Sequence, residues 1–252
     1  MKICGKATFV LLFRASAGDE PAGTVASSGE RAAGGRFYHR KAGKIHMRSK
    51  ICLIRHGITE GNKHRLYYGY ADIPLAEEGI ASLKELAERG IYPDSSNADF
   101  YTTGLMRTEQ TMEIIYGKRE HGILPQLREM NFGDYEMKSH GELKVLEYYR
   151  TWRADSFGTI APPNGESLQG FYKRIVRGFD DFEKKHMLKV LSMRHRNEEA
   201  LSVVVCHGGT ISAILESIYP KIKDNFYKWI PDPGHGYTLY MEDEDVLGVE
   251  KF

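Results

Sequence analysis

Two histidines, each followed by glycine, stand at the ends of two short apolar runs of this sequence. Arg55-His56-Gly57 follows the run 51–54, and His207-Gly208-Gly209 follows the run 201–206. A short apolar run that ends in a glycine turn is typical of a buried strand, and in open α/β sheets ligands bind beyond the carboxyl ends of the strands. We therefore expect both imidazoles and the Arg55 guanidinium at one binding crevice.

The residue types at these strand ends suit an anionic ligand. A single histidine there is more often a packed or solvated side chain, but two of them, each before a glycine and joined by an arginine, favour a site. Glycine lacks Cβ, so an anion can approach the backbone closely. Thr59, Asn62 and the amides of the turn supply further donors. The pattern therefore indicates anion binding.

These motifs resemble those of the histidine phosphatase superfamily, the phosphoglycerate mutase-like proteins. Residues 55–62 match its RHGxTxxN signature. Five further motifs follow in family order: Gly69-Tyr70-Ala71-Asp72-Ile73-Pro74-Leu75, Arg107-Thr108-Glu109-Gln110-Thr111, Leu127-Arg128-Glu129 with Phe132-Gly133-Asp134-Tyr135-Glu136, Asn164-Gly165-Glu166-Ser167 and Cys206-His207-Gly208-Gly209. The resemblance covers residues 50 to 240 and implies a three-layer α/β/α sandwich with a largely parallel central sheet.

The resemblance also implies roles for individual residues. His56 resembles the family nucleophile, a neutral imidazole that attacks phosphorus and becomes phosphohistidine. Arg55, Arg107 and His207 would hold the phosphoryl oxygens, with Asn62 as a fourth contact, because guanidinium groups suit bidentate contact with phosphate. This clamp could replace the charge stabilisation that a metal gives elsewhere, so neither a metal nor a cofactor is expected.

Glu129 occupies the position that provides the general acid in the phosphatase branch of the family. With His56 and His207 it makes up the predicted catalytic residues. Taken alone, Glu129 would be a solvated loop carboxylate. Arg107, which shares its helix with two glutamates, would be a surface ion-pair partner. For both residues the family motif favours the functional interpretation.

Other polar residues have structural interpretations. Glu166 is expected to start a long helix, where a carboxylate suits the positive end of the helix dipole. Three tyrosines near the site, at 67, 68 and 70, could stack on a ring, but such clusters are more often ordinary packing. The remaining histidines of the body show no ligand spacing and are expected to be surface or structural residues: His64, His121, His140, His186, His195 and His235.

Charge and cysteine content exclude several classes of function. The net charge is +1, with 35 basic and 34 acidic side chains, which gives no electrostatic footprint for nucleic acid. Residues 1–48 alone carry +6, so the remainder carries −5. Cys4, Cys52 and Cys206 are isolated, without CxxC spacing, so we expect no disulfide framework, no zinc site and a reducing, cytoplasmic location.

The first 48 residues differ from the rest in being rich in glycine, alanine, serine and arginine. We expect a disordered or non-native extension over residues 1–48 and a histidine phosphatase domain over residues 49–252, with no second domain. The apolar run 8–13 ends at Arg14, too short to span a bilayer, and no membrane partner is expected. Because Met47 precedes the first strand, a translated upstream region, a leader and a cloning remnant all stay open.

Periodicity predicts the scaffold around these motifs. Strands alternate with helices, which favours βαβ units and a parallel sheet covered on both faces. Beyond the two histidine strands, the expected elements are helices over 77–89, 106–116 and 210–218, a long helix with an apolar stripe from Glu166 onward, a strand over 99–103 and two strands within 236–251.

Two departures from the family pattern affect the expected structure. Ala76 stands where the family often has a threonine that caps the following helix, which weakens that helix start by about 1 kcal/mol. Glu77 and Glu78 partly offset this loss through the helix dipole. Met137 replaces a glycine that commonly follows the Tyr-Glu pair, so the loop near Glu129 is expected to take a different path.

The sequence as a whole predicts a metal-independent phosphomonoester hydrolase that acts on a small phosphorylated metabolite through phosphohistidine. The segment from Glu129 to Asn164 is shorter than in the cofactor-dependent phosphoglycerate mutases, and their histidine-tyrosine-glycine motif is missing after the Arg107 helix. Residues 69–75 resemble the sugar-phosphate and α-ribazole phosphatase branch. Two alternatives stay open: a mutase that returns the phosphoryl group to another hydroxyl, and a noncatalytic phospholigand-binding protein. The sequence names neither the substrate nor the oligomeric state, and a homodimer stays open.

Overall fold

The computed structural model describes residues 47–196, 198–222 and 225–252. Residues 1–46 of the expected N-terminal extension lie outside the described residues. The last two residues of that extension, Met47 and Arg48, are described and are part of the folded body. Arg48 opens strand β1 (Arg48–Arg55), and the amide of Met47 donates to a carboxylate oxygen of Asp243 at 3.1 Å. The described body therefore extends two residues ahead of the expected boundary at residue 49.

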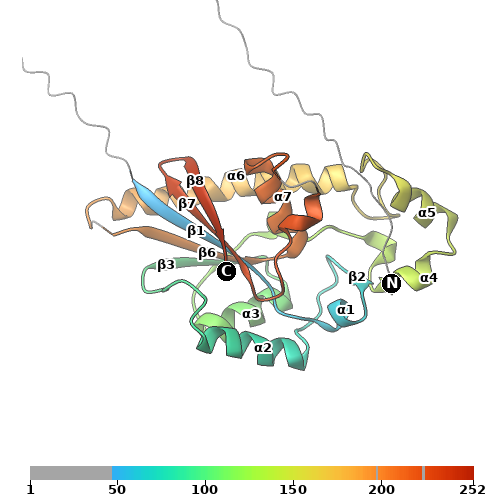
Figure 1. Ribbon diagram of the computed structural model, residues 1–252, viewed down its shortest axis with the longest axis horizontal. Coiled ribbons are helices and arrows are strands. Elements are labelled where there is room, and N and C mark those ends of the chain that lie inside the picture. The colour runs from blue at the N-terminus through green and yellow to red at the C-terminus, as the bar shows by residue number, and fades with distance from the viewer. Residues whose placement is uncertain (1–46, 197, 223–224) are drawn as a thin grey trace, which may run out of the picture.

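A six-stranded sheet forms the centre of the fold, in the order β4-β3-β6-β1-β7-β8 (Figure 1). β6 pairs in parallel with β1 and β3, and β3 pairs in parallel with β4. β7 is antiparallel to both of its neighbours, β1 and β8. In the β1–β6 register Arg55 lies opposite Cys206, so His56 and His207 follow at one edge, as predicted. The remaining strands are β2 (Leu66–Tyr67), β3 (Ala98–Thr102), β4 (Gly122–Ile123), β5 (Lys138–Ser139), β6 (Ala200–Cys206), β7 (Gly236–Glu242) and β8 (Asp245–Lys251).

Helices cover both faces of this sheet, which confirms the three-layer α/β/α architecture (Figure 1). Successive residues of β1 point to opposite faces of the sheet, and both faces are covered, which explains why its run is apolar throughout. Ile51 and Leu53 pack in the core cluster that holds α6 and α7 side chains, whereas Cys52 and Ile54 pack in the one that holds Met112 of α3. The helices are α1 (Glu60–Lys63), α2 (Glu77–Glu88), α3 (Met106–Tyr116), α4 (His140–Leu143), α5 (Glu147–Ala154), α6 (Leu168–Met193) and α7 (Gly208–Ile218), with short 3₁₀ turns at Pro125–Leu127, Gly133–Tyr135 and Phe226–Trp229.

The long helix α6 begins two residues later than predicted. Ser167 is its N-cap, with the side chain accepting from the amide of Gly170, so Glu166 precedes the helix instead of starting it. The expected stripe is buried: Phe171, Ile175, Phe179 and Phe182 all lie in the core. The prediction for Glu166 was wrong because the serine that follows it caps the helix, by accepting from one free amide of the first turn.

The two departures from the family pattern have visible local outcomes. α2 starts after Ala76, which has no side-chain acceptor to cap it, and acidic Glu77 and Glu78 occupy its first turn, as expected. Met137 has φ 61°, the left-handed conformation that glycine adopts without strain. Its amide donates to the carbonyl of Tyr67, which pairs β5 with β2. The loop thus uses a glycine-like backbone although it carries a methionine.

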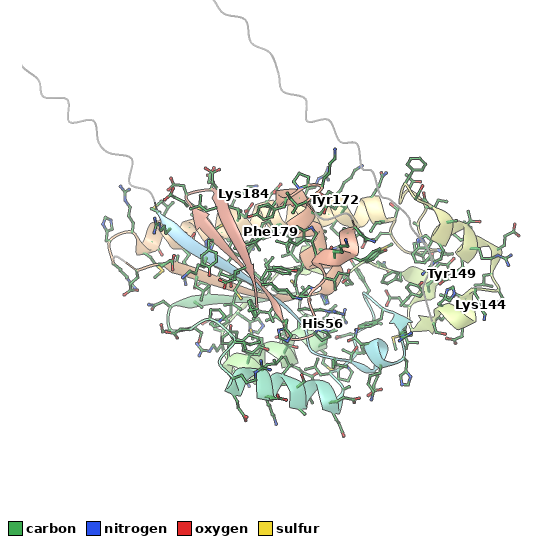
Figure 2. All side chains as sticks on the ribbon, in the orientation of Figure 1. His56, Lys144, Tyr149, Tyr172, Phe179 and Lys184 are labelled. Carbon is green, nitrogen blue, oxygen red and sulfur yellow. The ribbon has the colours of Figure 1, made fainter. Side chains whose placement is uncertain are left out.

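A small subdomain with α4 and α5 lies beyond the carboxyl edge of the sheet (Figure 2). It contains the two-stranded sheet β2-β5 and a separate aromatic cluster built on Tyr135, Leu143 and Tyr149. The hydroxyl of Tyr149 contacts Tyr67 at 2.8 Å and His140 at 2.6 Å. These contacts make His140 a structural residue, as expected, and hold Tyr67 in a packed position.

Two further predictions about buried groups can be compared with the structure. Cys52 and Cys206 are free and buried, as expected for core residues, and burial raises the pKa of Cys52 to about 12. His186 is buried between the hydroxyls of Ser49 and Ser202, which is a structural role.

In the part of the chain that the structure describes, no helix is both long enough and apolar enough to cross a membrane.

Candidate active site

His56 is buried immediately after β1, with one ring nitrogen held by the backbone. Its Nδ1 lies 2.7 Å from the carbonyl oxygen of Gly57, which can only accept, so Nδ1 carries the proton and Nε2 carries the lone pair. The amide of Gly57 donates to Thr111 Oγ1, whose hydroxyl donates to the carbonyl of Arg107. The His56 turn is therefore tied to the first turns of α3, and Nε2 is the nitrogen free to act as a nucleophile.

The surroundings of His56 keep its ring neutral. The pKa of His56 lies well below the usual 6.5, first because burial disfavours the charged form and then because Arg107 and Arg55 repel it. The hydrogen bond to Gly57 raises the pKa but does not offset these effects. At neutral pH the imidazole is therefore in the form that can attack phosphorus.

His207 is the N-cap of α7 and lies against His56. The two ring centroids are 5.3 Å apart, and His207 is fully buried. Its Nε2 lies 2.9 Å from the hydroxyl of Thr103, just beyond β3. Burial, followed by repulsion from Arg107, His56 and Arg55, holds the pKa of His207 well below its usual value. Strands β1 and β6 thus bring the two histidines together, as predicted, and β3 adds Thr103, whose contact with His207 was not predicted from the sequence.

Arg107 is buried and not a surface ion-pair partner. Its Nη1 and Nη2 donate to the carbonyls of Ala71 and Gly69, and its guanidinium lies over the Tyr68 ring, 5.1 Å from the centroid. Arg55 donates from Nη1 to the carbonyl of Pro231. Burial lowers the pKa of both arginines, yet nearby Tyr68 and Glu129 oppose this effect. Both guanidinium groups are therefore anchored by backbone carbonyls.

Three buried nitrogens of this site have no partner within the described residues: Nε of Arg55, Nε of Arg107 and Nδ1 of His207. Of the buried side-chain nitrogens and oxygens that the structure describes, only two others share this condition, the hydroxyls of Tyr116 and Tyr135. Leaving a buried polar group unsatisfied is costly, so such groups in native proteins usually have a ligand, ion or water. Two guanidinium groups and an imidazole that converge on one place fit a bound anion.

Glu129 brings a carboxyl group to the same place from the loop after the Pro125–Leu127 turn. One oxygen accepts from the amide of Met130 at 3.0 Å and the other from the amide of Gly209 at 2.8 Å. Burial raises the pKa of Glu129, and those two amides with Arg107 and Arg55 counter part of the rise. The side chain is thus held in the site, unlike a solvated loop carboxylate, with a carboxyl group that takes up a proton more readily than usual.

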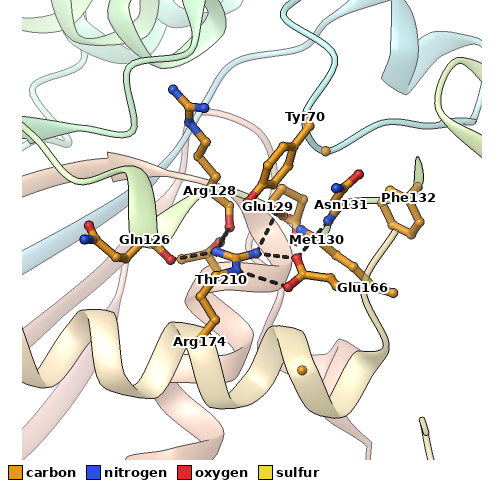
Figure 3. Close-up of polar contacts among 12 residues, drawn as sticks. Tyr70, Gln126, Arg128, Glu129, Met130, Asn131, Phe132, Glu166, Arg174 and Thr210 are labelled. Atoms are coloured by element: carbon orange, nitrogen blue, oxygen red, sulfur yellow. Dashed lines mark hydrogen bonds and ion pairs between the residues drawn. The ribbon is translucent and has the colours of Figure 1, made fainter. Parts of the chain in front are cut away.

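Arg174 of α6 braces the Glu129 loop and was not anticipated from the sequence (Figure 3). Its guanidinium donates to the carbonyls of Gln126, Arg128 and Glu129 and pairs with the carboxylate of Glu166. Glu166 also accepts from the amide of Asn131. In the sequence, the feature that could have indicated this role was the position of Arg174, a charged residue next to the apolar stripe of α6. It did not reveal the partners, because they are backbone carbonyls of a distant loop.

Asn62 closes a capping box on the short helix α1. Its side-chain oxygen accepts from the amide and hydroxyl of Thr59, and the Thr59 hydroxyl accepts from the amide of Asn62. None of these contacts uses the Nδ2 group of Asn62. The expected contact between Asn62 and phosphate therefore stays a prediction.

Glu136 is a second residue whose role the sequence did not reveal. Its carboxylate accepts from four backbone amides, those of Gly69, Tyr70, Ala71 and Phe132. The carbonyls of Gly69 and Ala71 also accept from Arg107, so Glu136 and Arg107 hold the same loop. Its place in the Phe-Gly-Asp-Tyr-Glu motif was the only signal. Across the described residues, no three acidic, histidine or cysteine side chains gather in a way that could hold a metal ion.

Relatives with known names match this chain in sequence. The chain is 36% identical over 132 residues to an adenosylcobalamin/α-ribazole phosphatase of Salmonella typhimurium; that match covers 51% of this chain and 64% of the relative, less than two thirds of its length. The protein of the same name from Escherichia coli is 32% identical over 161 residues, which cover 61% of this chain and 77% of the relative. A 2,3-bisphosphoglycerate-dependent phosphoglycerate mutase of Bartonella henselae is 29% identical over 184 residues, 68% of this chain and 82% of the relative.

The fold and the motifs agree with these matches. The crystal structure of the α-ribazole phosphatase from Shigella flexneri superposes with a TM-score of 0.66 at 26% identity, covering 81% of this chain and 96% of that one. The model of the histidine phosphatase superfamily, branch 1, matches residues 51–247, the segment that carries both histidine strands, Arg107 and Glu129. The chain belongs to the histidine phosphatase superfamily, branch 1.

Proposed function

We propose that the chain is a phosphomonoester hydrolase that works through a phosphohistidine at His56. One observation carries this proposal: the neutral, buried imidazole of His56 lies 5.3 Å from the His207 ring, between centroids, and is repelled by Arg55 and Arg107, and each of these three neighbours has a buried nitrogen without a partner among the described residues. A phosphate ester dianion needs cationic donors, a nucleophile and a proton source. Arg55, Arg107 and His207 are the proposed donors, and His56 is the proposed nucleophile. Glu129 is the proposed proton source.

The reaction has two steps that use the same groups. In the first, Nε2 of His56 forms a bond to phosphorus while the ester oxygen leaves and takes a proton from the Glu129 carboxyl group. In the second, water attacks phosphorus, its proton goes to the Glu129 carboxylate, and the phosphorus–nitrogen bond breaks. Inorganic phosphate and the starting enzyme result. Asn62 is proposed as a further phosphate contact through its Nδ2 group, which the capping-box contacts do not use.

The proposed mechanism is metal-independent and needs no cofactor. Two guanidinium groups, that of Arg107 bonded to two backbone carbonyls and that of Arg55 to one, supply preorganised positive charge where the transferring phosphoryl group develops negative charge. Preorganised donors of this kind cost no reorganisation at the moment of reaction. The guanidinium groups of Arg55 and Arg107 therefore support a phosphate clamp that acts in place of a divalent cation.

The proposed substrate is a small phosphorylated metabolite, with α-ribazole phosphate and sugar phosphates as the first candidates. The names of the Salmonella and Escherichia coli relatives support this choice. Of the tyrosines near the site, Tyr68 packs under Arg107 and Tyr67 against Trp152, which favours ordinary packing for both. Tyr70 is 40% exposed, and its ring faces the Arg174 guanidinium at 5.9 Å. Tyr70 is therefore the most exposed of the three tyrosines.

A panel of phosphometabolites, with released phosphate and isomeric products both measured, tests the proposal. Phosphate release that disappears in the His56→Ala variant supports it. Transfer of the phosphoryl group to another hydroxyl would instead favour a mutase, the activity named for the Bartonella relative. Binding without turnover would favour a noncatalytic phospholigand-binding protein.

The proposal extends to partners and location. The expected partner is the small phosphorylated substrate, with neither nucleic acid nor membrane, and the near-neutral net charge of +1 supports the absence of a nucleic-acid role. Two free, buried cysteines support a reducing, cytoplasmic location. A homodimer is compatible with this function and is tested by measuring the mass in solution.

A further inference from the structure

His207 is connected to a short chain of hydroxyl groups that ends on a backbone carbonyl. Its Nε2 lies 2.9 Å from Thr103 Oγ1, which lies 3.3 Å from Thr108 Oγ1. The Thr108 hydroxyl lies 2.7 Å from the carbonyl oxygen of Leu105. Thr103, Thr108 and His207 are all fully buried, so bulk water does not compete for these contacts.

The direction of each hydrogen bond follows from counting protons. A carbonyl oxygen only accepts, so the single proton of the Thr108 hydroxyl goes to Leu105. We take the 3.3 Å contact between the two threonines as a hydrogen bond. Thr103 is then its donor, because the Thr108 proton is already used, and this uses the only proton of the Thr103 hydroxyl. His207 must therefore donate from Nε2 to Thr103. Every hydroxyl in this arrangement donates once.

This direction decides which nitrogen of His207 is left for a ligand. In a neutral imidazole only one nitrogen carries a proton, so a proton on Nε2 leaves Nδ1 with a lone pair. Nδ1 is the buried nitrogen that has no partner among the described residues. Without a ligand this nitrogen is thus an acceptor, although an anionic phosphoryl group requires a donor there.

We propose that the Thr103–Thr108 hydroxyl chain holds His207 as the Nε2-H tautomer, so that Nδ1 takes up a proton from solvent when a phosphoryl dianion binds. Thr103 is then a positioning residue that acts through His207. This inference rests on the proposed function, because it takes the ligand to be a phosphoryl group.

The charges around His207 agree with uptake on binding. Groups from several elements face its ring: Arg55 and His56 of the β1 end, Arg107 of α3, Arg174 of α6 and the Glu129 carboxyl group held by Gly209. The three arginines disfavour a second positive charge without a ligand. A bound dianion reverses this balance, and the imidazolium at Nδ1 then donates to a phosphoryl oxygen.

Nitrogen-15 NMR of the histidine rings in the unliganded wild-type protein tests the tautomer directly. We expect the His207 signals of a protonated Nε2 and an unprotonated Nδ1 near neutral pH. Addition of inorganic phosphate should convert His207 to the doubly protonated form. Calorimetry of phosphate binding in buffers of different ionisation enthalpy should then show proton uptake. A protonated Nδ1 in the unliganded protein would overturn the inference.

Three variants separate the hydroxyl chain from general packing. Thr103→Val keeps the shape but removes the hydroxyl, so the tautomer preference should be lost and kcat/KM should fall on the order of tenfold, as for loss of one hydrogen bond to a buried group. Thr103→Ser keeps the hydroxyl and should restore both. Thr108→Val frees the Thr103 proton for Nε2 of His207, so the protonated Nδ1 form should now be populated.

Ser202→Ala is the matched control, because it also removes a buried hydroxyl bonded to a histidine, His186, outside the site. It should leave the His207 signals and kcat/KM unchanged. If Thr103→Val behaves like Ser202→Ala, the inference is wrong. Failure of the wild type to bind phosphate or hydrolyse any phosphomonoester would contradict the proposed function. A wild type that does both but keeps Nδ1 protonated would contradict only the hydroxyl chain.

Discussion

The carboxyl group of Glu129 is held against the first turn of α7 by the amide of Gly209, 2.8 Å from Oε2. A Cβ at residue 209 would come within 2.4 Å of Oε1, so this contact requires glycine. Gly209 follows His207 by two residues. The same turn therefore places an imidazole of the proposed phosphate clamp and the proposed general acid beside each other.

Replacement of Glu129 should separate its role from that of the clamp. An alkyl phosphate has a basic leaving oxygen that needs a proton, so Glu129→Gln should lower its turnover roughly 10²–10⁴-fold. An aryl ester with an acidic phenol should lose far less in single-turnover measurements of the phosphorylation step. The exposed Glu113→Gln is the control and should change neither rate. Equal losses for both esters would indicate a positioning role, and no loss would indicate a solvated carboxylate.

The pH dependence of kcat/KM should follow from the two shifted groups. His56 must be neutral to attack, and its pKa is lowered, so activity should persist below pH 6.5 and fall only as pH drops through that lowered pKa. Glu129 must be protonated, and its pKa is raised above 4.5, so activity toward alkyl esters should fall as pH rises through that raised pKa.

A comparison of wild type and variant isolates the two limbs of this profile. Wild type and Glu129→Gln acting on the same alkyl ester share the second ionisation of its phosphate group, near pH 6, so the ratio of their rates cancels it. The alkaline limb should disappear in Glu129→Gln while the acid limb remains. An alkaline limb that persists in this variant would assign it to another group.

His56→Ala should abolish turnover and leave the fold intact, because the variant removes the only ring nitrogen proposed to attack. Brief incubation of the wild type with substrate, followed by an alkaline quench, should trap a base-stable, acid-labile phosphoryl group that the variant lacks. The exposed His195→Ala should behave as wild type. Undiminished turnover in His56→Ala would exclude this histidine as nucleophile.

Chelation should not affect activity, because Arg55 and Arg107 are proposed to supply the charge that a divalent cation supplies in metal-dependent phosphatases. Phosphate release should be equal before and after prolonged treatment with a chelator and removal of the metal complex. A loss of activity that one divalent ion restores would reveal a metal site.

A protein that starts at Met47 should have the same melting temperature and turnover as the full chain. Met47 itself must stay, because its amide donates to Asp243 and its carbonyl accepts from the Asp243 amide, which joins the start of β1 to the β7–β8 turn. A start at Lys50 is the informative comparison and should melt lower. Destabilisation by the Met47 start would show that the preceding residues contribute to the fold.

The sequence alone determined the elements and the edge at which the site lies. Apolar runs of β1 and β6 are periodic over short distances and end in glycine turns, so local pattern was sufficient to predict that His56 and His207 meet. The helix over 106–116 was predicted with its observed bounds, and Glu129 was identified by its motif. The start of the long helix was misplaced at Glu166 because Ser167 and Glu166 both suit a helix start.

Tertiary structure decided how these groups are held and in which protonation form. Thr103 reaches His207, Arg174 reaches the Glu129 loop, and Glu136 gathers four amides, across sequence separations of 104, 45 and up to 67 residues. Such contacts depend on the packing of whole elements, which no local pattern encodes. Burial, which lowers the pKa of His56 and raises that of Glu129, is likewise a property of the assembled core.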